Sequence, residues 1–90
     1  MLVQREEIRY SPAGVPLLAA VLAHSSEQPE AGVARKIDLE LSAVFAGKVA
    51  QAAARLDPGC RLTARGFLAP RRRQSKLMAL HVTEFEIIEV

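Results

Sequence analysis

The residues with the clearest chemical potential lie in one short segment near the end of the chain, GFLAPRRRQSKLMALHV. Its centre carries four cations, Arg71, Arg72, Arg73 and Lys76, and no acidic residue. Guanidinium and ammonium groups on an exposed turn can contact phosphates and release condensed counterions, so the segment indicates a nucleic-acid contact. The alternative is a solvated turn kept basic for solubility, although acidic residues serve solubility better.

A second, weaker group of cations lies near the middle of the chain. The polar stretch SSEQPEAGVARK ends in Arg35 and Lys36, which would extend a basic surface. For each of these two residues taken alone, an ordinary surface charge is the favoured interpretation.

Aromatic residues, on which single-stranded nucleic acid stacks its bases, are scarce. The chain has no tryptophan, one tyrosine and three phenylalanines. Phe67 falls on the outward phase of its segment and is the best stacking candidate, with Tyr10 beside a turn as the next. Phe45 and Phe85 are expected in the core. With so few stacking residues, we expect phosphate contacts to dominate and binding to depend steeply on salt.

The sequence carries no recognisable catalytic or metal-binding pattern. It lacks a nucleophile elbow, a phosphate-binding loop, a CxxC pair and an HExxH pair. His24 and His81 have no cysteine or histidine partner at ligand spacing, so both are expected to be surface or core histidines. Glu84, Glu86 and Glu89 alternate as a solvated strand face would. We therefore predict no enzymatic activity, no metal and no cofactor.

The composition indicates one globular domain over residues 1–90. Half of the residues are hydrophobic, and the net charge is +2. No apolar run is long enough to span a membrane. The first residues, MLVQREEIRY, place charges where a signal peptide would be apolar, so a cytoplasmic location is expected. The single cysteine, Cys60, cannot form an internal disulfide and is expected to be a buried, inert thiol rather than a reactive one.

Five segments have the character of strands. Residues 2–10 are mixed, 17–24 are continuously apolar, and 35–45 alternate with Ile37, Leu39 and Leu41 on one side. Residues 60–69 alternate again, and the segment from Met78 continues the pattern until its phase shifts, which suggests a β-bulge near Thr83. A turn is predicted at SPAGVP, and a loop is predicted over the whole polar stretch 25–32.

One segment, 46–56, changes to a helical period and ends at DPG. The chain is therefore all-β, with one short helix between the third and fourth strands. This order predicts a five-stranded OB-fold barrel, in which Gly66 would mark a sharp bend of the fourth strand. An open five-stranded sheet covered by the helix is the alternative. In an OB fold the turn between the last two strands, here the basic one, helps to bind oligonucleotides.

Several of these motifs together resemble a known family. RYSPAGVP, HSSEQPEAG and RGFLA, followed by a basic loop and LHVTEFEII, look like primosomal replication protein N (PriB). The resemblance runs from about Arg5 to the end of the chain. It implies a homodimeric OB-fold protein that binds single-stranded DNA and the PriA helicase, stimulates that helicase, and acts in replication restart. It also implies DnaT and single-stranded DNA-binding protein as candidate partners.

The resemblance bears on individual residues as well. Family contacts to DNA include lysines of the loop that here carries Arg71, Arg72, Arg73 and Lys76, and Arg35 matches a basic position. A family tryptophan is replaced near Ile37, so one stacking contact is missing. The main hypothesis is a DNA-binding accessory protein of the restart primosome. An OB-fold protein-interaction module with weak or no DNA binding remains the alternative.

Overall fold

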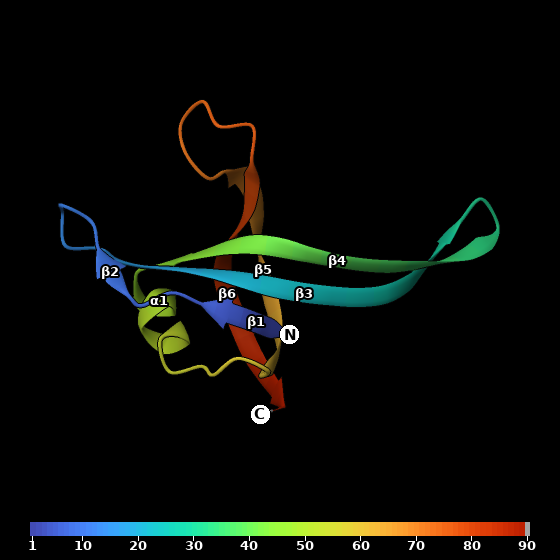
Figure 1. The fold of residues 1–90 in the computed structure, drawn as a ribbon, viewed down its shortest axis with the longest axis horizontal. Helices are drawn as coiled ribbons and strands as arrows, with labels where there is room; N and C mark the ends of the chain where they lie inside the picture. Colours follow the sequence, from blue (N-terminus) through green and yellow to red (C-terminus); the bar gives the residue numbers. More distant parts are fainter. Residues whose placement is uncertain (90) are drawn as a thin grey trace.

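A computed structural model describes residues 1–89 as one mixed β-sheet with a short helix (Figure 1). The elements are β1 (Leu2–Arg5), β2 (Arg9–Tyr10), β3 (Pro16–Glu30), β4 (Val33–Ala46), α1 (Lys48–Ala53), β5 (Arg61–Pro70) and β6 (Met78–Glu89). Val90, the last residue of the predicted domain, lies outside the described residues.

The strand order is that of an OB barrel. Neighbours follow the order β1-β3-β4-β6-β5, β2 pairs with β3, and β4 and β6 run parallel while the other pairs are antiparallel. Leu2 joins the two ends of this order, because its amide donates to the Cys60 carbonyl (2.9 Å) and its carbonyl accepts from the Gly59 amide (2.7 Å). The predicted all-β fold is confirmed. Its helix lies between the third and fourth predicted strands, which are β4 and β5 of the structure.

The first predicted strand is broken in the structure. The segment 2–10 divides into β1 and β2, with Glu6–Ile8 outside both strands. The Glu6 amide still donates to the Ala19 carbonyl (2.9 Å), so this stretch stays attached to β3. The five predicted strands are thus present as six.

The predicted loop at 25–32 is wrong. β3 and β4 continue through it as a long hairpin, paired from Leu17 with Ala46 to Glu30 with Val33. The turn needs only two residues, Ala31 and Gly32, and both have positive φ, as tight hairpins require. A polar composition suits this part because it projects away from the barrel into solvent (Figure 1). At Pro29, β3 pairs with β4 alone, because β1 pairs with β3 only at residues 20–22. Pro29 therefore lies on an edge strand, where proline is tolerated.

The core lies between the barrel strands and α1. Phe45, Leu2 and Leu18 are the largest fully buried side chains, and Cys60 is buried with them. Phe45 meets Phe85 edge to face, with ring centroids 5.8 Å apart. The core positions predicted for the two phenylalanines and for the cysteine are confirmed, although Phe85 is only partly buried.

Alternation along the strands predicts a face but not burial. Leu39 and Leu68 lie on the predicted inward phase, yet they are 43% and 60% exposed. Leu39 belongs to the part of β4 that extends past the barrel, and Leu68 lies near the end of β5. The helix is likewise shorter than predicted, beginning after Gly47 and ending at Ala53.

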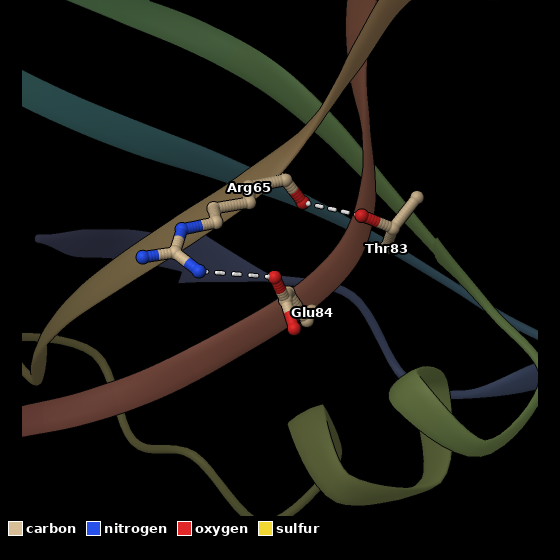
Figure 2. A network of polar contacts seen from close by, with 3 residues as sticks. All are labelled: Arg65, Thr83 and Glu84. Carbon is tan, nitrogen blue, oxygen red and sulfur yellow. Dashed lines mark hydrogen bonds and ion pairs between the residues drawn. The ribbon is translucent and has the colours of Figure 1, made fainter.

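The predicted bulge near Thr83 is present. Arg65 pairs with Glu84 and Gly66 pairs with Val82, so Thr83 has no partner in the ladder. The Thr83 hydroxyl donates to the Arg65 carbonyl (3.1 Å), and the Arg65 guanidinium meets the Glu84 carboxylate at 3.2 Å (Figure 2). The two backbones are very close here, since a Cβ added to Gly66 would lie 1.9 Å from the His81 carbonyl oxygen. Gly66 is therefore required by this close approach.

We expect Gly66→Ala to lower the free energy of unfolding by about 3 kcal/mol, the upper end for an overpacked site, because the new methyl group must separate the two strands. Chemical denaturation followed by circular dichroism measures this. The neighbouring substitution Arg65→Ala serves as the control. It removes only an exposed ion pair and should cost about 0.5 kcal/mol or less. Equal stability of the two variants would contradict the account of the bulge.

Candidate nucleic-acid interface

The basic segment forms the turn between β5 and β6, at one end of the molecule (Figure 1). Backbone hydrogen bonds shape this turn, from the Arg71 amide to the Leu77 carbonyl and from the Ser75 amide to the Arg72 carbonyl, both 3.0 Å. Gln74 takes a positive φ of 67° at its tip. We call residues 71–77 the basic hairpin.

The four cations of the basic hairpin are exposed and unneutralised. Arg71, Arg72, Arg73 and Lys76 all lie on the surface, and within residues 1–89 none of them forms an ion pair. Three exposed cations elsewhere do have acidic partners: Arg65 faces Glu84, Arg35 faces Glu30 and Lys36 faces Asp38. Four cations within six residues, unpaired among the residues described, make this turn a local concentration of positive charge.

A groove lies beneath the basic hairpin on the outer face of the sheet. It has a volume of about 370 Å³ and is lined by Arg71, by Gln4 and Arg5 of β1 with the acidic Glu6 that follows them, and by residues of β3 and β4 such as Val21 and Ser42. The Arg5 guanidinium donates to the Leu56 carbonyl (2.7 Å), so that hydrogen bond orients it. The groove could hold a stretch of polynucleotide backbone under Arg71.

Phe67 lies on the same face of the sheet, in β5, which β6 separates from the groove strand β4. It is 56% exposed, and its ring stacks on the ring of His81 with centroids 5.2 Å apart and an angle of 5° between the planes. The cross-strand register continues from Phe67 to His81, then to Val44 and Ala19. These four residues form a row across the sheet that leads toward the groove, of which Ala19 is a lining residue.

His81 is a participant that the sequence did not reveal. Predicted only as a surface or core histidine, it is partly buried, and its Nε2 atom is buried without a hydrogen-bond partner among the described residues. Its position opposite Phe67 depends on the bulge at Thr83. Knowledge of the strand register, rather than of either residue type, would have been needed to find it.

The structure does not bring Arg35 and Lys36 together with the basic hairpin. They lie near the tip of the β3–β4 hairpin, which projects in another direction (Figure 1). Arg35 pairs with Glu30 at 2.7 Å and Lys36 with Asp38 at 3.8 Å. As consecutive strand residues, they also point to opposite faces.

Tyr10 is also apart from Phe67. It lies in β2, pairs with Pro16 and is 62% exposed. The turn that follows it is closed by the Ser11 amide, which donates to the Val15 carbonyl (2.9 Å). Its partner Pro16 begins β3, whereas the groove is lined by Ala19–Val21 farther along that strand, so Tyr10 lines neither the groove nor the Phe67 row.

Among residues 1–89, no cluster of three or more histidine, cysteine, aspartate or glutamate side chains is arranged to hold a metal ion. His24 is an exposed residue whose Nε2 lies 2.9 Å from the Ser26 hydroxyl, as expected for a surface histidine. No helix in the same range is long and apolar enough to cross a membrane.

Comparison with known proteins gives the family. Residues 1–84 match a family model described as another single-strand binding protein family. Replication restart protein PriB of Bordetella pertussis is 40% identical over 86% of this chain and 72% of its own length. The corresponding protein of Nitrosomonas europaea is 36% identical, over 89% of this chain and 74% of its length.

Solved structures support the same family assignment. A structure of PriB from Ralstonia solanacearum superposes with a TM-score of 0.88 at 39% identity, covering 98% of this chain and 90% of that one. The single-stranded DNA-binding protein of Thermus aquaticus, at 20% identity and a TM-score of 0.74, shares the fold, covering 98% of this chain and 46% of that one.

The expectation that the chain is not an enzyme is confirmed by this kinship, since the matched family is one of binding proteins. The extent and identity of the matches also confirm the resemblance drawn from its motifs. The chain belongs to the PriB family of OB-fold single-strand binding proteins.

Proposed function

We propose that this protein binds single-stranded DNA through the basic hairpin and serves in replication restart, where it docks the PriA helicase and stimulates it. The observation that carries the proposal is the set of four exposed cations without acidic partners, among the described residues, above a groove on the sheet. Kinship with proteins named for replication restart supports the cellular role.

Phosphate contacts would supply most of the affinity. Each phosphate neutralised by a cation releases condensed counterions, and this term does not depend on base sequence. Arg71 overhangs the groove, and the other three cations extend the positive surface along the hairpin. A DNA strand that follows the groove would pass under the hairpin.

Stacking would add a smaller contribution. Phe67 offers an exposed ring next to the basic hairpin, and Tyr10 offers another beside the first turn. Ile37, near the position of the family tryptophan, cannot stack a base as an aromatic ring does. Arg35 and Lys36 have acidic partners and would contribute less than the basic hairpin.

A protein partner on the same hairpin is a second candidate function. Leu77 and Leu68 are 69% and 60% exposed at the base of the basic hairpin, next to its arginines. Apolar side chains surrounded by cations suit a protein surface that is both acidic and apolar. PriA is the partner that we propose for this surface, with DnaT and single-stranded DNA-binding protein as further candidates.

We also propose a homodimer. β5 is the last strand in the sheet order and pairs only with β6, so much of its outer edge is open. Exposed edges and apolar residues such as Ile87 and Ile88, at 51% and 66% exposed, favour association with another copy.

Light scattering during size-exclusion chromatography should give about twice the 9.8 kDa mass of one chain at micromolar concentration. Burial of the open edge and the apolar residues in a two-fold interface is the physical reason. A mass that stays at 9.8 kDa across this concentration range would reject the homodimer.

Simultaneous replacement of Arg71, Arg72, Arg73 and Lys76 by alanine should weaken binding of a labelled oligothymidylate. The slope of log affinity against log salt should fall by roughly 0.7 for each phosphate that the variant no longer neutralises. Fluorescence anisotropy at several salt concentrations measures both quantities. Stability should change by only about 0.5 kcal/mol, because the substitutions are at an exposed turn.

A control is Lys48→Ala with Arg55→Ala, which removes two exposed cations, one in α1 and one just after it, instead of the four of the basic hairpin. This pair should leave the slope unchanged if location, rather than net charge, decides binding. A quadruple variant with the affinity and slope of the parent protein would exclude the DNA role of the hairpin. Loss of PriA binding in that variant would then support the protein-docking function.

A further inference from the structure

His81 is a partly buried group to which the functional proposal gives no role. Its ring lies parallel to that of Phe67, at 5.2 Å and 5°, on the outer face of the sheet. The two residues are direct cross-strand partners in the β5–β6 ladder. On the other side, His81 is the partner of Val44 in β4.

Hydrogen bonding does not account for a histidine at this position. The buried Nε2 atom has no partner among the described residues, so it loses its hydrogen bond to water without replacement. Such an orphaned polar atom is unfavourable for folding. An aliphatic residue of similar volume would avoid the penalty, but it would lack a flat ring to stack on Phe67.

The flat ring matters because Phe67 is exposed. An exposed phenylalanine on a strand samples several rotamers and loses that freedom when a base stacks on it. A parallel neighbouring ring limits those rotamers before any ligand arrives. Preorganisation of this kind raises affinity without making a new contact to the ligand.

We propose that His81 is a positioning residue of the single-strand site, holding the Phe67 ring in the orientation that accepts a stacked base. The inference rests on the proposed function, because it assigns the role through Phe67. It requires an aromatic ring at residue 81 rather than a proton or a charge, so phenylalanine should replace histidine and alanine or leucine should not.

The chain has no tryptophan, which makes a clean optical test possible. The variant Phe67→Trp carries a single indole whose fluorescence should be quenched when oligothymidylate stacks on it. This variant is compared with the same substitution combined with His81→Phe, His81→Leu or His81→Ala. Quenching at saturation should persist with phenylalanine at residue 81 and fall with leucine or alanine.

Affinities measured by anisotropy complete a double-mutant cycle on the otherwise unmodified chain. His81→Ala and His81→Leu should each weaken binding by about two- to tenfold, the range for the loss of one aromatic pair. His81→Phe should stay close to the parent affinity, and none of the three should change the salt slope. Adding His81→Ala to Phe67→Ala should weaken binding much less than His81→Ala does alone, because the role is exercised through that ring.

The outcomes separate the two proposals. If Phe67→Ala weakens binding but His81→Ala and His81→Leu do not, the positioning role is wrong and the DNA site stands. If the two losses are fully additive, His81 acts independently of Phe67 and the inference is also wrong. If Phe67→Ala has no effect while the quadruple hairpin variant abolishes binding, stacking at Phe67 and the role of His81 both fall, and phosphate binding remains. Because His81→Phe and His81→Leu both keep a large side chain, loss of folding in His81→Ala alone leaves the comparison decisive.

Discussion

The close approach of β5 and β6 at Gly66 is the constraint on which the candidate interface depends. Thr83 bulges out of the ladder there, and the pairing register changes across it. Without the bulge, Phe67 would pair with Val82, and His81 would point inward. With it, Val82 enters the core beside Phe45, and His81 turns outward to stack on Phe67. The one extra residue at the bulge, Thr83, thus sets the orientation of a core residue, Val82, and of a surface residue, His81.

The distribution of charge distinguishes the basic hairpin from the rest of the surface. Arg35, Lys36 and Arg65 meet acidic partners, whereas the four cations on the basic hairpin meet none among the described residues. The net charge of +2 is therefore a poor guide to the local field. A modest overall charge with one unneutralised turn allows attraction of a phosphate backbone without general affinity for acidic surfaces.

Much of this arrangement was predictable from local patterns. Alternation and the switch to a helical period indicated the OB order, and the phase change after Val82 located the bulge. The long β3–β4 hairpin was not predictable, because Ser25, Glu27 and Pro29 favour loops in isolation and form a strand only where one edge and both faces meet solvent. The Phe67–His81 pair and the separation of Arg35 and Lys36 from the basic hairpin were not predictable either, because both depend on the pairing of strands that are distant in the sequence.

The central claim is that single-stranded DNA lies across the outer face beneath the basic hairpin. Backbone amide chemical shifts of the labelled protein, followed during titration with oligothymidylate, test it most directly. The account predicts the largest changes at residues 71–77, Phe67 and His81, with small changes at Arg35 and Lys36. Changes concentrated at the tip of the β3–β4 hairpin, with residues 71–77 unaffected, would contradict it.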